Sequence, residues 1–248
     1  MKKYLLSLLA IAAIICASCE KKPQPDPKPV DPDDPEKEYV APITIDGDFA
    51  DWAKLDATKV ATATCPAGAK YTQLKSVKVY ADEQYVFFYC EYTPNLEGYV
   101  TMDVFLNADN SDETGGYGDH WTDANSEWLM EGAVESWDCS LNKWWGEVGA
   151  NGWTWNDPSI EHGDWDAWGS FLPEGSGFGA SAGDLAAGKT EFSIMRAMLE
   201  ESCAFADTFS VGFMLSADWA EAGFLPCVAM TDDNPNGLAP KLVVNVVK

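Results

Sequence analysis

Short apolar or alternating stretches follow one another along most of the chain, separated by Gly, Asp, Asn and Pro. Several are rich in the aromatic and β-branched residues that strands favour. We expect strands at Ile43–Ile45, Val77–Ala81, Tyr85–Tyr92, Tyr99–Leu106, Trp128–Gly132, Ala133–Trp137, Lys189–Ile194, Phe209–Leu215 and Leu242–Val247. Asp82–Gln84 predicts a tight hairpin connection, and Met195–Glu201 predicts a helical turn. This pattern indicates an all-β fold, a two-sheet antiparallel β-sandwich of the jelly-roll or immunoglobulin-like kind.

The first 19 residues have the pattern of an export signal. Two lysines precede the apolar run Tyr4–Ile15, which is too short to cross a membrane comfortably, and small residues lead to Cys19. The pattern resembles a bacterial lipoprotein signal peptide, which implies that residues 1–18 are removed and that Cys19 is acylated. Cys16 fits less well, because bulky isoleucines precede it. The alternative is an ordinary secretory signal with incidental cysteines.

Residues 20–42 hold 7 of the 14 prolines. Proline at every second or third position removes helix and sheet hydrogen bonds, so we expect a disordered tether here. In polyproline II geometry, at about 3.1 Å per residue, it would reach up to roughly 70 Å. The predicted organisation is a signal peptide at 1–18, an acylated cysteine with its Pro-rich linker at 19–42, and one sandwich domain at 43–248.

The chain is strongly acidic, with 16 Lys and Arg against 40 Asp and Glu and a formal charge of −24. Phosphate binding needs clustered basic residues, so this composition argues against a nucleic-acid partner. The same charge disfavours anionic lipid heads and acidic polysaccharides, and it suits neutral ligands and Ca²⁺. No later apolar stretch is long enough to span a bilayer, which leaves the lipid as the expected membrane attachment.

Several stretches resemble the family-nine-like carbohydrate-binding modules, which are DOMON-like β-sandwiches. In chain order the clearest are Ile43–Trp52, Lys78–Tyr92, Val104–Gly116 and Glu127–Gly132. The resemblance implies a two-sheet antiparallel sandwich that binds sugars, often with structural Ca²⁺, in tethered surface proteins of glycan-degrading bacteria. Within the first stretch, we expect Trp52 to close one end of the core rather than to bind sugar.

The loop after Leu106 is the best candidate for a cation site. Ca²⁺ prefers six to eight oxygen ligands, which closely spaced Asp and Asn side chains supply. The expected ligands are Asn107, Asp109 and Asp112, and we expect a structural role for the ion. Asp112 stands where an EF-hand requires glycine, so the loop is not an EF-hand. The alternative is a solvated acidic turn, which is the interpretation we favour for Asp232–Gly237.

Seven of the eleven tryptophans fall between Trp137 and Trp168. Gly, Asn and Asp interleave with them, so we expect a loop-rich segment that cannot bury all seven indoles. Sugar C–H faces stack on aromatic rings, and sugar hydroxyls bond to short polar side chains. Trp153 and Trp155 alternate and also fit a strand that faces the core. Four tryptophans expected to be exposed, with two aspartates, form the predicted ligand site: Trp144, Trp145, Trp165, Trp168, Asp164 and Asp166.

Catalytic patterns are weak. Gly179–Gly183 matches the G-x-S-x-G nucleophile pattern, but its flanks do not predict the strand, turn and helix that the motif needs, and we expect a flexible loop. No histidine follows His162 to complete the usual order of a triad. A carboxylate pair of the glycosidase kind stays open, because forty acidic residues supply many chance pairs.

The cysteines of the predicted domain are odd in number. An exported domain of this kind is expected to hold one or two disulfides and at least one free thiol, or simply buried thiols. The sequence leaves the pairing open among Cys65, Cys90, Cys139, Cys203 and Cys227.

Together these patterns predict a non-catalytic glycan-binding protein, lipid-anchored in the outer membrane at the cell surface. The expected partners are a neutral oligo- or polysaccharide, the membrane through the lipid anchor, and other surface proteins of glycan uptake, with no nucleic acid. Two alternatives stay open. One is a structural or adhesive surface lipoprotein whose Trp-rich segment contacts a protein, and the other is a glycoside-processing enzyme.

Overall fold

The computed structural model describes residues 39–116, 120–123, 125–134, 140–144, 170–172, 179–200 and 203–248, with backbone alone at 170–172. Ala41–Lys248 forms one compact unit, and of the other unit, Met1–Val40, only Tyr39 and Val40 are described. No helix within the described ranges is long and apolar enough to cross a membrane. The architecture given below is that of the unit Ala41–Lys248.

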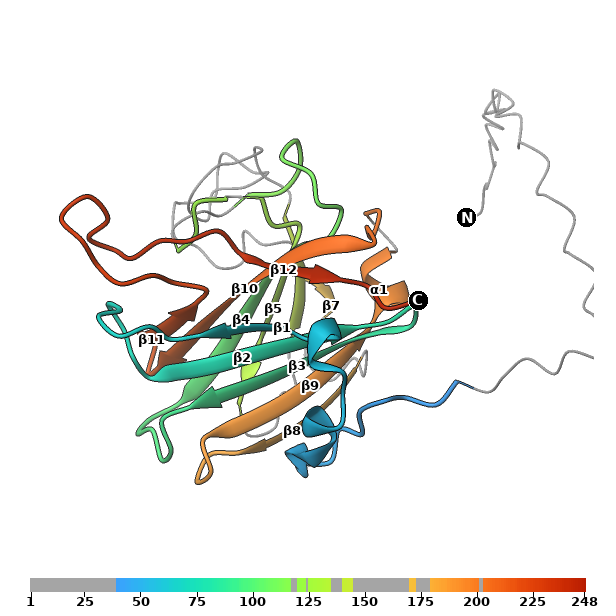
Figure 1. Ribbon diagram of the computed structural model, residues 1–248, viewed down its shortest axis with the longest axis horizontal. Helices are drawn as coiled ribbons and strands as arrows, with labels where there is room; N and C mark the ends of the chain where they lie inside the picture. Colours follow the sequence, from blue (N-terminus) through green and yellow to red (C-terminus); the bar gives the residue numbers. More distant parts are fainter. Residues whose placement is uncertain are drawn as a thin grey trace, which may run out of the picture. The chain divides into compact units, whose positions relative to one another are not determined.

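Two antiparallel sheets pack face to face, which confirms the predicted all-β sandwich (Figure 1). The nearer sheet in Figure 1 has five strands in the order β1-β2-β3-β9-β8. Its strands are β1 (Ala61–Thr64), β2 (Leu74–Ala81), β3 (Tyr85–Tyr92), β9 (Lys189–Met195) and β8 (Gly179–Asp184). The β2–β3 connection is the predicted hairpin, in which Asp82 Oδ1 accepts hydrogen bonds from the backbone N–H groups of Gln84 and Tyr85.

The second sheet has seven strands in the order β11-β10-β4-β5-β6-β7, and β12 also pairs with β10. The long strand β10 holds β4 along one edge and both β11 and β12 along the other. The strands are β11 (Ala220–Leu225), β10 (Thr208–Ala217), β4 (Val100–Asn107), β5 (Trp128–Ala133), β6 (Ser140–Lys143), β7 (Ser170–Leu172) and β12 (Leu242–Asn245). Short helices interrupt the connections: η1 (Phe49–Ala53), η2 (Ala57–Lys59) and α1 (Arg196–Glu200).

The main core lies between the two sheets. Alternate residues of each strand point into this space, because successive side chains of a strand face opposite sides. Phe88 of β3 stacks on Phe192 of β9 with ring centroids 4.8 Å apart, and it meets Phe213 of β10 edge-on at 6.0 Å. Aromatic packing thus joins the two sheets at the centre of the sandwich.

The outer face of the five-stranded sheet is covered by the segment that contains the sequence IDGDFADW. Ile43 and Trp52 are buried there against Tyr80 and two other aromatic rings of the sheet. Glu191 of β9, which is fully buried, holds the segment in place. Its carboxylate accepts hydrogen bonds from the backbone N–H of Asp46 (3.1 Å), the backbone N–H of Gly47 (2.9 Å) and Trp52 Nε1 (3.0 Å). The expectation that Trp52 packs in the core is confirmed.

Most predicted strands match observed ones, but two expectations were wrong. Ile43–Ile45 is not a strand, because Glu191 takes the backbone N–H groups that follow it and the segment crosses the sheet as an irregular cover. Gly179–Gly183 is not a loop but most of strand β8, at the edge of the sheet. Its small residues have weak strand propensity, and pairing with β9 overrides that preference. Residues 135–137 of the predicted strand Ala133–Trp137 lie outside the described ranges.

We predict that Glu191→Ala lowers the free energy of unfolding by about 2–3 kcal/mol, because three donors lose their acceptor and the Trp52 indole N–H is left buried without one. Glu191→Gln, which keeps one acceptor oxygen, should cost about half as much. Urea denaturation measures the difference, with the exposed Glu97→Ala as the matched control. A Glu191→Ala protein as stable as Glu97→Ala would contradict this account of the clamp.

Candidate functional site

The seven-stranded sheet is covered on its outer face as well, and that face carries the candidate site. Every residue of β4 is buried, on both sides of the sheet. Val104 and Leu106 of β4 belong to the main core, whereas Phe105 belongs to a second cluster on the opposite face. The outer cluster consists of Phe105, Trp121, Leu129, Trp144, Met214 and Phe224.

Two tryptophans lie against glycines in this outer cluster. The indole of Trp121 occupies the space above Gly212 of β10, where a Cβ atom would come within 2.4 Å of the ring. The indole of Trp144, directly after β6, fills the corresponding space at Gly116, where a Cβ would lie 2.0 Å away. Trp144 is only 6% exposed, so the expectation that its side chain is exposed was wrong. It packs as part of the cover of the sheet.

A polar strip crosses the same face nearer the β10–β11 hairpin. Asp103 of β4 and Glu131 of β5 are direct cross-strand neighbours, and Thr101 and Ser216 face each other one step further along. Directly opposed residues have Cβ atoms about 4.5–5.5 Å apart. Asp103 is 3% exposed, and its Oδ1 atom is buried without a hydrogen-bond partner. Burial, and then the nearby charge of Glu131, raise the pKa of Asp103 well above its usual range.

An exposed aromatic pair stands at the end of this strip. Tyr99 precedes β4, and alternation places it on the side that carries Thr101 and Asp103. Its ring lies 5.7 Å from that of Trp219, which is 72% exposed. Asp218 fixes the pair, since its side chain accepts the Tyr99 N–H at 2.8 Å and its own N–H donates to the Tyr99 carbonyl at 2.9 Å.

Trp219 also adopts an uncommon backbone conformation, with φ of 67°, next to Asp218 at 48°. Positive φ at a bulky residue is unfavourable and is held only where the surroundings enforce it, often at functional positions. The hairpin therefore presents the indole of Trp219 to solvent.

A second polar group gathers at the other end of β4, in the predicted cation loop. Asp109 accepts hydrogen bonds from Ser111 N–H and from the Thr114 hydroxyl, each at 3.0 Å. The Thr114 hydroxyl also lies 3.2 Å from Glu127 Oε1, and Asn107 Nδ2 donates to the Ser111 carbonyl at 2.9 Å. The loop thus brings Asn107, Asp109 and Glu127 together.

This loop group places carboxyl, amide and hydroxyl oxygens near one another. Burial, and then the charge of Asp109, raise the pKa of Glu127 to about 7, against hydrogen bonds from Ala108 N–H and Thr114. Asn107 Oδ1 is buried and has no hydrogen-bond partner. In the described ranges no group of three or more His, Cys, Asp or Glu is arranged around a metal position. The oxygen set offered here is two carboxylates, one amide and one hydroxyl, which fits hard cations such as Ca²⁺.

The expected ligand set Asn107, Asp109 and Asp112 stays a prediction. Asn107 and Asp109 belong to this polar group, and Asp112 is exposed. Glu127 joins the group from 18 residues further along than Asp109, immediately before β5. Antiparallel pairing of Leu106 with Trp128 makes Asn107 and Glu127 neighbours. Pairing the two predicted strands in this register would therefore have indicated Glu127 from the sequence.

His120 joins a third group that the sequence did not indicate. Its Nε2 atom lies 3.0 Å from Glu221 Oε1 of β11, and its ring packs between Trp121 and Phe224. Tyr71 donates its hydroxyl to the same carboxylate. The hydrogen bond from His120 is the largest cause that lowers the pKa of Glu221, to about 2. This group ties β11 to the cover of the outer face.

Most of the predicted ligand residues lie outside the described residues. These are Trp145, Asp164, Trp165, Asp166 and Trp168, and the same holds for Cys19. Their roles stay predictions. The exposed pair Tyr99–Trp219 was not predicted, although the turn at Asp218 between two apolar stretches was a signal that a side chain there would face solvent.

No protein-family model matches the chain, and a search of curated proteins finds no match either. The chemistry of the outer face combines exposed aromatic rings, hydroxyls and a carboxylate pair along one strip.

We predict that Asp103→Asn stabilises the protein at neutral pH and not in acid. The raised pKa means that the folded state resists ionisation of Asp103, so its carboxyl contributes most stability below the unfolded pKa near 3.8 and loses it as pH rises toward the folded value. Asn stays neutral, so the variant should exceed wild type by about 1 kcal/mol at pH 8 and match it near pH 4.

Urea midpoints at the two pH values test this prediction. Glu91→Gln, on the outer face of the other sheet, is the control for a general charge effect. An Asp103→Asn difference that is the same at both pH values would show that folding does not shift the pKa of Asp103.

Proposed function

We propose that the chain is a non-catalytic binding protein for neutral oligo- or polysaccharides, exported and held at the outer membrane by acylated Cys19. The binding surface is the outer face of the seven-stranded sheet. The observation that carries the proposal is the exposed Tyr99–Trp219 pair at the end of the polar strip. Other surface proteins of glycan uptake are the expected neighbours at the membrane.

The chemistry of a sugar matches this strip. A pyranose presents C–H groups that stack on an aromatic ring, and hydroxyls that need acceptors and donors beside it. Trp219 and Tyr99 supply the rings, and Thr101, Asp103 and Glu131 supply oxygens. Asp103 Oδ1, which is buried without a partner, has the unmet bonding capacity of a site built for a polar ligand.

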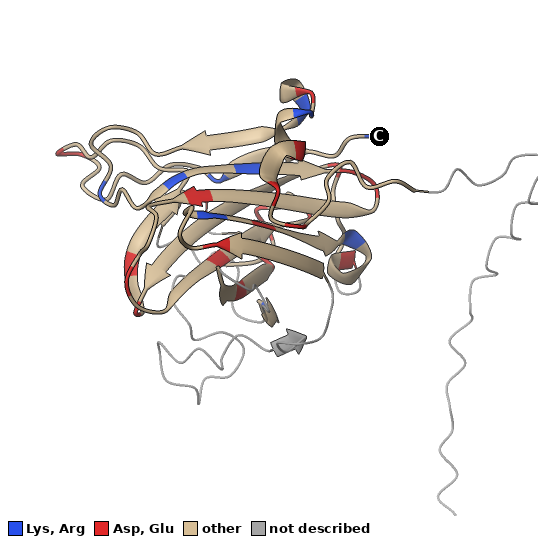
Figure 2. Ribbon diagram, turned by 90° about the horizontal axis from the view of Figure 1, so that it is seen from below, with Lys and Arg blue, Asp and Glu red and all other residues tan. Residues whose placement is uncertain are grey.

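The position of the Trp-rich stretch in the sequence gives further support. The stretch lies between the end of β5 and the start of β7 and includes β6, and all three strands belong to the seven-stranded sheet. Trp145, Trp165, Trp168, Asp164 and Asp166 are proposed to extend the binding surface. Acidic residues are scattered over the strands and loops of the described chain rather than confined to one patch (Figure 2). With a formal charge of −24, the protein repels acidic glycans and leaves neutral ones as ligands.

The proposal includes a structural Ca²⁺ bound by Asn107, Asp109 and Glu127. The buried amide oxygen of Asn107 supports it, because a cation would give that oxygen a partner. The nearby carboxylates of Asp109 and Glu127 support it too, because a cation would screen the repulsion between them. Such an ion would fix the loop that carries His120 and Trp121 onto the outer face. Its role would be to order the cover of the sheet.

A second candidate function is glycoside processing, and the pair Asp103–Glu131 is the observation that favours it. Retaining glycosidases place two carboxyl groups about 5–5.5 Å apart, with one held protonated as the acid. Neighbouring strands can give a similar spacing, and the raised pKa of Asp103 would suit the acid. Release of products from a glycan would distinguish this function from binding alone.

We predict that the chain without its anchor (residues 20–248) is retarded by at least one neutral polysaccharide in affinity electrophoresis. Trp219→Ala and Glu131→Ala should each weaken that binding about tenfold or more, because they remove a stacking face and a hydroxyl partner. Trp165→Ala tests the Trp-rich stretch in the same gel.

The matched control is Glu91→Ala, a half-buried carboxylate on the outer face of the other sheet, which should bind as wild type does. Sugar release by wild type that is lost in Asp103→Asn would replace the binding function by the enzymatic one. Absence of retardation across the whole panel would refute the sugar ligand for those glycans.

We predict that 1 mM Ca²⁺ raises the Tm of the same protein by about 5–10 °C, as expected for a ligand at roughly a hundred times its Kd. Asp109→Asn and Glu127→Gln should abolish the rise, because each removes a charged ligand. Asp112→Asn should keep it. If the Ca²⁺-dependent rise in Tm is lost in Asp112→Asn but kept in Glu127→Gln, the ligands are those expected from the sequence. If Ca²⁺ does not raise the Tm of the wild type, the proposed calcium site is refuted.

A further inference from the structure

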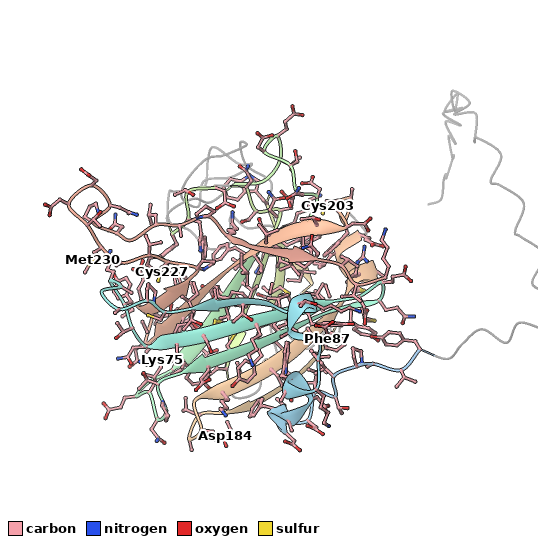
Figure 3. All side chains as sticks on the ribbon, viewed as in Figure 1. Lys75, Phe87, Asp184, Cys203, Cys227 and Met230 are labelled. Atoms are coloured by element: carbon pink, nitrogen blue, oxygen red, sulfur yellow. The ribbon has the colours of Figure 1, made fainter. Side chains whose placement is uncertain are left out.

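Two loops at one end of the sandwich are joined by backbone hydrogen bonds. One follows β1 and includes Cys65 and Gly68, and the other follows β11 and includes Cys227 and Met230, the last two labelled in Figure 3. Met230 N–H donates to the Gly68 carbonyl at 2.9 Å, and Gln73 N–H donates to the Ala222 carbonyl at 3.1 Å. The loops belong to opposite sheets, so these bonds bridge the edges of the sandwich.

The thiols of Cys65 and Cys227 meet between these loops. The Cys65 thiol lies 3.6 Å from the Tyr71 carbonyl oxygen and 3.7 Å from that of Pro66, and it is close enough to the Cys227 thiol to perturb it. Both cysteines are half-buried, and both pack against the main core. They are close to each other and not sealed from solvent.

The other described cysteines have different surroundings. Cys90 is fully buried on β3, inside the main core. Cys203 accepts a hydrogen bond from Trp128 Nε1 at 3.0 Å and donates to the Leu199 carbonyl at 3.6 Å. Among the cysteines that the structure describes, Cys65 and Cys227 are the pair whose thiols are in mutual contact, and Cys139 lies outside the described residues.

We propose that Cys65 and Cys227 form a disulfide when the chain reaches an oxidising compartment. The oxidant is a disulfide, of a protein thiol oxidase or of oxidised glutathione. One thiolate attacks that disulfide and releases one oxidant thiol, and the second thiolate then displaces the other. Two thiols become one S–S bond, and the oxidant disulfide is reduced to two thiols. Small movements within the loops bring the sulfurs to the bonding distance of about 2.05 Å.

The crosslink would join two segments about 160 residues apart in sequence, at the edges of opposite sheets. It would fix Tyr71, which packs against the outer cluster and donates to Glu221, the partner of His120. The bond thus fastens the loop beside the outer face as well as the sandwich. This proposal rests on the export that the proposed function includes, but not on glycan binding.

The test is oxidation of the reduced chain 20–248 in a glutathione buffer, followed by alkylation and peptide mapping. We expect the five thiols of this chain to fall to three, with one crosslink between Cys65 and Cys227. Cys203 shares a tryptic peptide with Cys227, so the map is made on Cys203→Ala, which also serves as the control that keeps the crosslink. Oxidation should raise Tm by roughly 5–15 °C.

Cys65→Ala and Cys227→Ala should each lose both the crosslink and the oxidation-dependent rise in Tm. Alkylation of both cysteines after oxidation, or a crosslink that involves another cysteine, would overturn the proposal. Glycan retardation is measured on the oxidised and the reduced protein in parallel. Formation of the Cys65–Cys227 disulfide in a protein that binds no glycan would support this inference and refute only the proposed binding function.

Discussion

The burial of β4 on both of its faces is the constraint on which the rest of the structure depends. A sheet in a sandwich has one face turned to its partner sheet, and its second face must either be polar or be covered. In this chain the second face carries Phe105, Leu129 and Met214, so it needs a cover. The loop with Trp121 and the residue after β6, Trp144, provide part of it, and the glycines beneath them give the indoles room.

Two buried carboxylates, one on each outer face, show how differently the two covers are built. Glu191 is fully buried, and three donors of the covering segment point at it, which is the behaviour of a structural clamp. Asp103 is almost as deeply buried, yet its Oδ1 has no hydrogen-bond partner and Glu131 lies beside it. A buried carboxyl oxygen without a hydrogen-bond partner is costly to a fold, so its retention favours a role toward a ligand.

Much of the fold followed from sequence. Tyr85–Tyr92 was predicted residue for residue, because it is rich in aromatic residues and the Asp82 turn precedes it. The strands β1 and β8 were missed, since their Ala, Thr, Gly and Ser residues carry little strand signal and pair only because β2 and β9 present free edges. The candidate site was anticipated less well. Polar neighbours in the sequence suggested that Trp144 is exposed. Its indole is instead buried, because it packs directly against Gly116, which has no side chain there.

The sequence by itself determined the local features: the strand periods, the hairpin at Asp82, the acidic charge and the residue types on offer for binding. These depend on neighbours along the chain, so a linear pattern records them. Only the tertiary structure decided which distant groups meet, such as Glu191 with Trp52, Asn107 with Glu127, and Cys65 with Cys227. Strand register and sheet order set those meetings, and register depends on the packing of both faces at once, which no single stretch of sequence specifies.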